Sequence, residues 1–401
     1  MKAVICGAGI AGLALAARLS QSGWEVTVVE PAPALRSEGY MIDLFGSGYE
    51  AAVRTHLLPY LLDVRYEFAA VRWLSESGRP QARLPWRVID GLLDGRLMTL
   101  VRGDLEQAVR AQLTSAVNLQ FNCAVTQLMT PVGGVEVHLS SGAVERADVV
   151  IGADGVHSRL RDLVFGDGAS WFRFMGFHTA ACVIDAPELS QSLQNEIHIV
   201  SAPGRQVALY PLRQGAIAAS FVHRAANSAP PYSPIAALES AYGDLGWHVP
   251  EVLKRAKTLP SIYYEQMGQV VMAHWCRGRI ALLGDACQAA TFLPGQGASL
   301  SLAAAYVLGE ELCNGTDVKV SLARYEHRVR PSLIHIRRSG RRAADWLVPA
   351  SNTGLVARNG LIRLAGRPGL ARLLRPVVEA AREDILSIAG ASSAGPSATL
   401  Q

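Results

Sequence analysis

The chain has 401 residues, half of them hydrophobic and 18% charged, which indicates a folded protein with a large core and more than one domain. Lysine and arginine exceed aspartate and glutamate by only four (38 against 34), a surplus too small to indicate binding to nucleic acid or anionic membranes by itself. No segment has the roughly 18 consecutive apolar residues of a membrane-spanning helix.

The N-terminus shows a strand–helix–strand pattern. Lys2–Cys6 is a short apolar run, Ile10–Gln21 has apolar residues at helical spacing, and Glu25–Glu30 reads as a second strand. This βαβ opening is the context in which a glycine-rich turn binds a dinucleotide.

The turn after the first strand carries the fingerprint G-x-G-x-x-G at Gly7, Gly9 and Gly12. These glycines permit a tight turn, close approach of a pyrophosphate and close helix packing. Glu30, at the end of the second strand, is placed to accept hydrogen bonds from ribose hydroxyls. The alternative is a glycine-rich turn in an unrelated α/β fold.

The middle of the chain alternates between helical and strand patterns. We expect a helix at Arg102–Leu113, paired strands at Asn118–Leu128 and Gly134–Leu139, and strands at Ala147–Ile151, Glu196–Val200, Gln206–Tyr210, Ala216–His223 and Arg279–Leu283. Helices are expected at Ala298–Leu312 and Leu322–Leu347, and disorder after Ala389. The stretch 171–272 is predicted to form a mainly antiparallel sheet.

Two later segments place an acid beside glycines at the end of a strand. Asp154 and Gly155 follow one strand, and Gly284 and Asp285 follow another. At such positions the backbone can approach a ligand closely. Asp285 could accept a hydrogen bond from a chain of hydroxyls, whereas Asp154 could instead cap the next helix. Gly295, Gln296 and Gly297 then open a helix whose N–H groups suit an electron-rich ring edge.

The order of these segments favours FAD over NAD. A simple NAD enzyme continues with further βα units, whereas this chain enters an antiparallel domain and then returns. The predicted fold is therefore α/β: a Rossmann-like FAD-binding domain with an inserted, mainly antiparallel β-sheet substrate domain and C-terminal helices. The expected division is 1–70, 97–170 and 273–321 for the FAD-binding domain, 71–96 and 171–272 for the substrate domain, 322–388 for the helical region, and 389–401 for the tail.

With these motifs in place, nearly the whole chain resembles the class A flavoprotein monooxygenases, the aromatic hydroxylases typified by p-hydroxybenzoate hydroxylase. The segments 39–43 and 305–312 resemble the subgroup that includes tetracycline-inactivating and polyketide-tailoring enzymes. The resemblance implies that cofactor contacts come from Gly7, Gly9, Ile10, Ala11, Gly12, Glu30, Arg36, Arg102, Val125, Asp154, Gly155, Gly284, Asp285, Gly295, Gln296, Gly297 and Ala298. For Arg102 the alternative is a structural ion pair, and for Arg36 a solvated loop residue.

The resemblance also implies the reaction. NAD(P)H would reduce FAD, O2 would add to give a flavin C4a-hydroperoxide, and an aromatic or polycyclic small molecule would take up its distal oxygen. We find no catalytic nucleophile motif or metal cluster. The chain has one dinucleotide fingerprint, which suits an enzyme in which the nicotinamide binds transiently without a Rossmann domain of its own. The alternatives are a flavin-dependent reductase, an antibiotic-inactivating oxygenase, or a non-enzymatic flavin-binding redox protein.

One departure from the family concerns the segment after Asp285. Many members have histidine and proline there, where this chain has Gln288, Thr291 and Phe292. The family's prolines help to shape the flavin pocket, so substrate placement is expected to differ.

The substrate is expected between the flavin and the antiparallel sheet. Candidate wall residues are His198, Tyr210, Phe221 and His223, of which Phe221 and His223 share a face by strand alternation. The alternative is that these residues belong to the core or to the surface.

The remaining features concern charge and location. Between Arg324 and Arg375 there are twelve arginines against two acids, which indicates a solvated helix face or a surface that attracts an anionic reductant or substrate. The six cysteines show no C-x-x-C pairing or metal-ligand spacing and indicate a reducing compartment. We therefore expect a cytoplasmic monomer or homodimer with no nucleic-acid partner and no metal.

Overall fold

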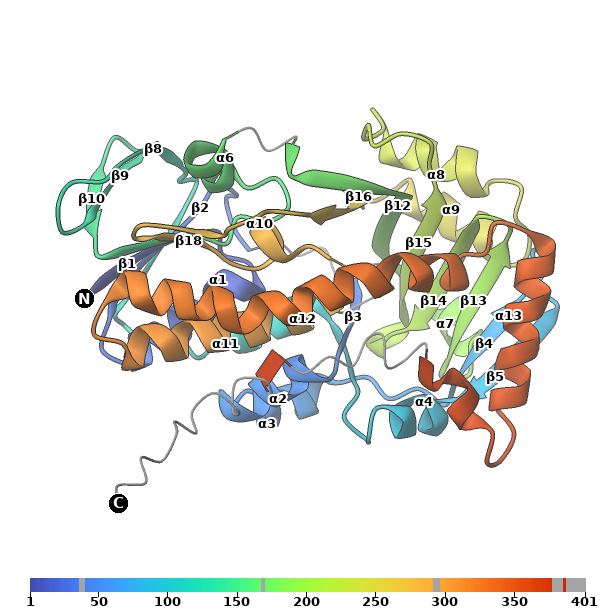
Figure 1. The fold of residues 1–401 in the computed structure, drawn as a ribbon. Coiled ribbons are helices and arrows are strands. Elements are labelled where there is room, and N and C mark those ends of the chain that lie inside the picture. Colours follow the sequence, from blue (N-terminus) through green and yellow to red (C-terminus); the bar gives the residue numbers. More distant parts are fainter. Residues whose placement is uncertain (36–39, 167–169, 291–295, 377–384, 387–401) are drawn as a thin grey trace, which may run out of the picture.

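The computed structural model describes residues 1–35, 40–166, 170–290, 296–376 and 385–386. Two large sheets form its two halves, and the long helix α12 (Val318–Leu347) runs past both of them (Figure 1). None of the described helices is long and apolar enough to cross a membrane.

The first sheet contains the predicted βαβ unit. Its strands lie in the order β17 (Cys276–Arg277), β18 (Ile280–Leu282), β11 (Val149–Gly152), β1 (Lys2–Cys6), β2 (Glu25–Glu30) and β7 (Val117–Phe121). All neighbours are parallel except β17 and β18. The central strand β1 is apolar over nearly its whole length because it lies in one core with helix residues such as Leu13 and with Val135, Val137 and Leu139 of a small neighbouring sheet. The predicted bounds of β1, β2 and the helix α1 (Ile10–Gln21) are confirmed.

One of the paired strands was predicted with the wrong extent. Asn118–Leu128 is not a single strand: it divides into β7 and β8 (Val125–Met129). Asn122 lies between them with φ of 53°, a left-handed conformation that ends a strand. Only β8 pairs with β9 (Val135–Leu139), and β10 (Val144–Ala147) completes that small sheet.

The second large sheet contains the predicted antiparallel strands. Its order is β16 (Tyr263–Val270), β12 (Phe172–Asp185), β15 (Ala216–Arg224), β14 (Arg205–Pro211), β13 (Glu196–Ala202), β4 (Ala70–Leu74) and β5 (Pro80–Pro85). Only the pair β13 and β4 is parallel. The strands of each large sheet come from separated stretches of the chain, so the two halves are interleaved in sequence.

The two faces of this sheet have different neighbours. One face packs beneath α8 (Pro234–Tyr242) and α9 (Val249–Ala256) in a closed apolar core that includes Phe221 and Leu238. The opposite face turns toward the first sheet, with β3 (Met41–Leu44) and β6 (Met98–Val101) as a two-stranded link. Successive residues of each strand therefore face two different environments, the core beneath α8 and α9 and the side toward the first sheet.

The remaining helices pack against the sheets and against one another. They are α2 (Ser47–Arg54), α3 (Leu58–Val64), α4 (Trp86–Leu92), α5 (Arg102–Arg110), α6 (Arg159–Phe165), α7 (Pro187–Ser192), α10 (Asp285–Gln288), α11 (Gln296–Asn314) and α13 (Asn352–Ala365), with short 3-10 turns at Arg213–Gly215 and Ala371–Leu374. α11 packs on α1 and α12, and Gly309 allows close contact because a Cβ there would lie 2.6 Å from the Arg18 side chain.

Candidate functional site

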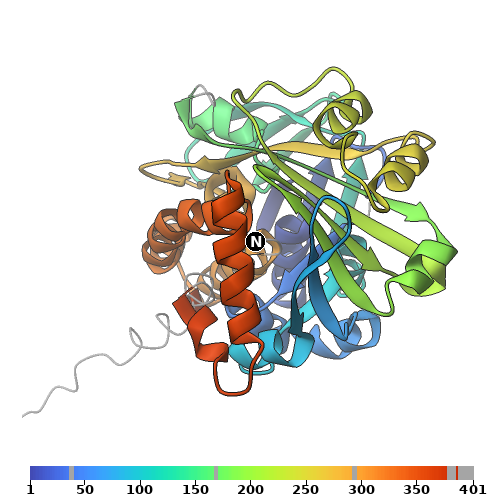
Figure 2. The same cartoon turned by 90° about the vertical axis from the view of Figure 1, so that its right-hand side faces the viewer.

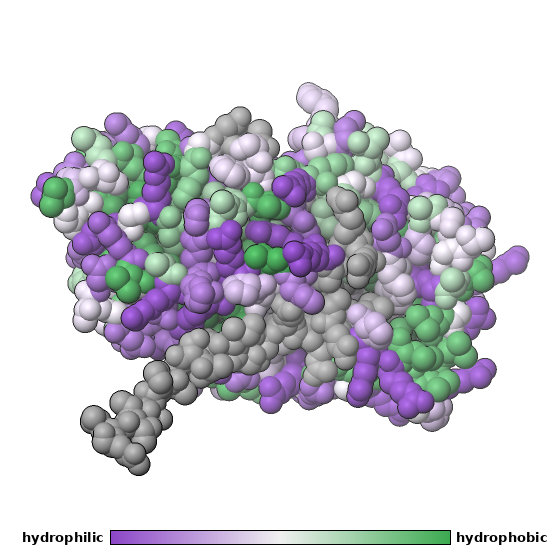
Figure 3. Space-filling view, in the orientation of Figure 1, coloured by the Kyte–Doolittle hydropathy of each residue, from purple (hydrophilic) through white to green (hydrophobic). Residues whose placement is uncertain are grey.

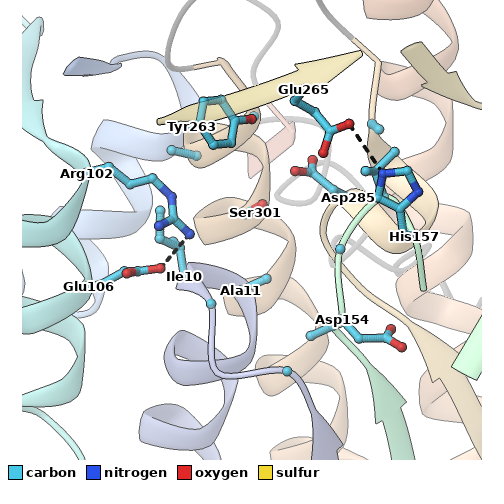
Figure 4. Close-up of a pocket in the computed structure, with 18 of the residues that line it drawn as sticks. Ile10, Ala11, Arg102, Glu106, Asp154, His157, Tyr263, Glu265, Asp285 and Ser301 are labelled. Carbon is cyan, nitrogen blue, oxygen red and sulfur yellow. Dashed lines mark hydrogen bonds and ion pairs between the residues drawn. The ribbon is translucent and has the colours of Figure 1, made fainter. Parts of the chain in front are cut away.

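A cavity of about 600 Å3 lies where distant segments of the chain meet between the two large sheets. Its walls come from the β1–α1 turn, the end of β2, the start of α5, the segment after β11, strand β16, and the segments that open α10 and α11 (Figure 4). The three glycine-and-acid segments of the sequence are therefore neighbours in space.

The glycines of the first turn have distinct tasks. Gly7 has φ of 108°, and a Cβ on it would lie 2.3 Å from the Ala153 carbonyl oxygen. A Cβ on Gly12 would lie 2.0 Å from the Gly7 carbonyl oxygen. Gly9 lines the cavity, and a Cβ there would meet nothing within 4 Å among the described residues. Gly7 and Gly12 thus permit the packing of the turn, whereas Gly9 leaves space for a ligand.

The N-terminus of α1 opens on this space. Gly9 provides no side chain to cap the helix, and Ile10 and Ala11 both line the cavity. The first N–H groups of the helix and its dipole therefore favour an anionic group such as a pyrophosphate.

Glu30 borders the cavity at the end of β2. Its carboxylate accepts hydrogen bonds from the backbone N–H of Ala8 at 2.9 Å and of Ala32 at 3.0 Å. Each carboxylate oxygen keeps a further acceptor position. The side chain is thus held in place and can also accept a hydroxyl group.

The two later acids behave differently from each other. Asp154 borders the cavity, but its carboxylate accepts from the Ser158 hydroxyl at 2.5 Å and the Leu160 N–H at 3.0 Å, so its side chain stabilises the start of α6. In the structure the Asp154 carboxylate therefore caps this helix, which is the alternative that the sequence left open. Its neighbour Gly155 lines the cavity with φ of 82°.

Asp285 directs its carboxylate toward the cavity from the turn at Gly284, where φ is 63° (Figure 4). Its accessible surface faces this internal space. Burial within the protein raises the pKa of Asp285, while Arg102 lowers it and Glu265 raises it. A hydroxyl donor from a ligand would stabilise the ionised carboxylate.

Arg102 opens α5 at the side of the cavity. Its guanidinium forms an ion pair with Glu106 at 2.6 Å and lies over the Tyr40 ring at 5.6 Å. Tyr40 in turn stacks on Tyr263 of β16 at 4.8 Å. Arg102 thus forms the ion pair that was the alternative to a cofactor contact, and it also lines the cavity.

Sequence reasoning missed the wall that the second sheet supplies. Thr179 of β12 and Tyr263, Glu265 and Met267 of β16 line the cavity. Glu265 also contacts His157, with 3.3 Å between its Oε1 and the histidine Nε2, so this pair joins the two halves. The sequence of β16, YYEQMGQV, does not alternate regularly between apolar and polar residues, so periodicity could not identify its inner face.

Three of the four proposed substrate residues lie on the far face of the second sheet. His198 packs on Trp247 at 5.4 Å, Phe221 is fully buried beneath α8, and His223 hydrogen-bonds the Tyr242 hydroxyl at 3.2 Å. The predicted shared face of Phe221 and His223 exists, but it points away from the cavity. Tyr210 lies on the near face beside Phe68 and is not among the lining residues.

The other predicted cofactor residues divide into three groups. Gly297 and Ala298 line the cavity, and Gln296 is buried at the start of α11. Val125 is 4% exposed in the apolar core and not among the lining residues. Arg36 and Gly295 lie outside the described residues.

Comparisons with known proteins agree with this geometry. A model of the FAD binding domain family matches residues 104–336, and a model of the NAD(P)-binding Rossmann-like domain matches residues 5–58. A flavin-dependent monooxygenase from an unknown prokaryotic organism is 30% identical and covers 82% of this chain and 86% of that protein. A Rhodococcus erythropolis protein named as a probable 2-heptyl-3-hydroxy-4(1H)-quinolone synthase, AqdB2, is 29% identical over 91% of this chain and 92% of its own length.

Among solved structures, tetracycline destructase Tet(55) is similar with a TM-score of 0.77 and 26% identity, covering 93% of this chain and 96% of that one. The fold and the cavity thus define an FAD-binding oxidoreductase. The chain belongs to the class A FAD-dependent monooxygenases. These findings do not favour the reductase or the non-enzymatic alternative.

The residues present fit FAD. Gly9 leaves room where a side chain would intrude, and the α1 N-terminus lacks a side-chain cap. Glu30, at the end of β2, and Asp285, after β18, both line the cavity and offer acceptors for hydroxyl groups. NAD(P)H is the co-substrate typical of this family.

Proposed function

We propose that this monooxygenase uses NAD(P)H and O2 to insert one oxygen atom into an aromatic or polycyclic small molecule. The observation that carries the proposal is the composition of the cavity, which has a dinucleotide-binding wall from the first half of the molecule and a mixed aromatic and polar wall from the second sheet. The names of two similar proteins, a quinolone synthase and a tetracycline destructase, refer to fused-ring molecules and support this class.

We infer the following cofactor contacts. The Gly9 backbone and the α1 N-terminus hold the pyrophosphate, Glu30 accepts hydroxyls of the adenosine ribose, and Asp285 accepts hydroxyls of the ribityl chain. Arg102, fixed by Glu106 and Tyr40, adds a positive charge beside the cavity. When bound, FAD supplies electron transfer and the activation of O2.

The second sheet forms the substrate side in this proposal. Thr179, Tyr263 and Met267 replace His198, Phe221 and His223 as the candidate contacts, because they line the same cavity as the cofactor residues. Their role is to orient the ring system and to exclude water, since binding and position are what the protein contributes in cofactor enzymes.

We further infer a cytoplasmic enzyme, from cysteines that have no pairing pattern, and a monomer or homodimer. The described cysteines are free and mostly buried, which suits a reducing environment.

The experiment is a screen of polycyclic phenols and quinolones for stimulated NAD(P)H oxidation, with product mass and labelled O2. The proposal expects a product that contains one atom of labelled oxygen, formed only with a ring substrate. NAD(P)H oxidation that no ring compound stimulates, with hydrogen peroxide as the sole product, would overturn it.

A further inference from the structure

Helix α13 has apolar side chains on its exposed side as well as on its buried side. Its buried side contains Leu355, Ile362 and Ala365 together with Arg358 and Asn359. On its exposed side, Val356 is 66% exposed and Leu364 is 43% exposed. A surface helix normally buries its apolar residues and exposes its polar ones. The outward position of these apolar side chains therefore needs an explanation.

The buried polar residues show that this orientation is specified. The Arg358 guanidinium donates to the Leu347 carbonyl oxygen at 2.7 Å, to the Ser201 hydroxyl at 3.1 Å and to the Asn359 side-chain oxygen. Burial lowers the pKa of Arg358 to about 10, so placing it inside has a cost that these bonds offset. These bonds fix which side of the helix faces inward.

The outward side of α13 and the turn after it also carries positive charge. Arg363, Arg367 and Arg372 are exposed, and Leu373 beside them is 40% exposed. Residues 346–376 contain no aspartate or glutamate. Figure 2 shows α13 facing outward beside the β4–β5 hairpin, and Figure 3 shows hydrophobic residues gathered near this end of the molecule with hydrophilic ones around them.

We propose that this surface, the α13 face, binds anionic lipid membranes. It consists of Val356, Leu364 and Leu373 with Arg363, Arg367 and Arg372. Arginines attract anionic headgroups, and exposed leucine and valine side chains enter the boundary of the acyl chains, which is how an interfacial helix binds without spanning the bilayer.

Other occupants fit the α13 face less well. A second copy of the chain would bring like-charged arginines together across a two-fold axis, which is repulsive. Nucleic acid would use the arginines but would leave the apolar side chains exposed to water. Only an anionic lipid surface matches both components.

The test is co-sedimentation of the full chain with vesicles of phosphatidylglycerol and phosphatidylcholine, and with vesicles of phosphatidylcholine alone. We expect binding to the mixed vesicles that weakens with salt, and little binding to the neutral ones. The variant R363E/R367E should bind the mixed vesicles at least about twentyfold more weakly. The variant V356S/L364S should bind them roughly tenfold more weakly at unchanged net charge.

The matched control is R110E/K254E, which changes the net charge equally at exposed positions on α5 and α9. It should lose much less binding than R363E/R367E, and all variants should keep wild-type far-ultraviolet circular dichroism. Wild-type protein that does not bind anionic vesicles at low salt, or equal losses in control and R363E/R367E, would overturn the proposal. A concentration-dependent dimer that V356S/L364S abolishes would also overturn it, because the face would then belong to a second copy.

Discussion

Gln288 donates a hydrogen bond to the hydroxyl of Tyr325 at 2.7 Å, and so ties the short helix after Asp285 to the long helix α12. The Gln288 side-chain oxygen accepts from the Gly284 N–H at 3.2 Å, and the Tyr325 hydroxyl donates to the Leu282 carbonyl oxygen at 3.0 Å. Both side chains are buried. Gln288, one of the three residues that depart from the family pattern, thus holds the turn that presents Asp285. The other two, Thr291 and Phe292, lie outside the described residues.

Removing the Tyr325 hydroxyl should weaken FAD binding. In Tyr325→Phe the Leu282 carbonyl and the Gln288 amide each lose a buried partner, which costs about 1 to 3 kcal/mol in the free energy of unfolding. Because the Gly284 turn is loosened, we expect FAD affinity to fall roughly tenfold in a fluorescence titration. Tyr242→Phe is the control: Tyr242 is equally buried but bonds His223 far from the cavity, so it should lose stability and keep FAD affinity.

Two glycines of the fingerprint should respond differently to the same substitution. In Gly9→Ala the new Cβ meets no described protein atom but occupies cavity space, so stability should stay within about 0.5 kcal/mol while FAD affinity falls at least about tenfold. In Gly12→Ala the Cβ would collide with the Gly7 carbonyl, so the protein itself should be destabilised. Urea unfolding of the apoproteins beside FAD titration separates the two. Equal unfolding curves for both variants would contradict this division.

Asp43 should make stability depend on pH. Burial raises the pKa of Asp43 to about 6, and the Thr99 hydroxyl, which donates to it at 2.5 Å, opposes this. The folded state holds this proton more tightly than the unfolded state, so the stability present below about pH 4 is lost as pH rises through about 6. Asp43→Asn should therefore gain about 1 to 3 kcal/mol over wild type at about pH 8, and much less at about pH 4.5. An equal difference in urea unfolding at both pH values would refute the assignment.

Thr179 should affect the substrate but not the cofactor. Thr179→Leu places a larger side chain in the cavity, and we expect kcat/KM for the ring substrate to fall roughly tenfold at unchanged FAD content. Thr179→Val keeps the size and removes only the hydroxyl, which donates to the Phe221 carbonyl oxygen, so it should change kcat/KM less. His223→Gln, on the far face, should leave it unchanged. A larger effect of His223→Gln would restore the original substrate assignment.

The sequence predicted well what is local. The bounds of β1, α1 and β2, and the three second-sheet strands β13, β14 and β15, follow from short-range periodicity and from glycines with defined tasks. The meeting of Gly9, Asp285 and Gly155 at one cavity was also predictable, because each follows the carboxyl end of a parallel strand.

The predictions that were wrong concern features that depend on long-range packing. Alternation showed that Phe221 and His223 share a face, but which face meets the cavity is decided by the docking of α8 and α9. The division at Asn122 depends on which neighbour each half of the segment finds. Likewise, periodicity cannot reveal that Arg358 is buried by bonds to Ser201 and Leu347.

The most direct test of the central claim is titration of the purified apoprotein with FAD, followed by the quenching of flavin fluorescence, in wild type and in Asp285→Ala. The structure predicts tight binding of equal amounts of FAD and wild-type protein, a yellow complex that NAD(P)H bleaches, and loss of that binding in Asp285→Ala. Wild-type protein that stays colourless and cannot be reconstituted with FAD would contradict the account.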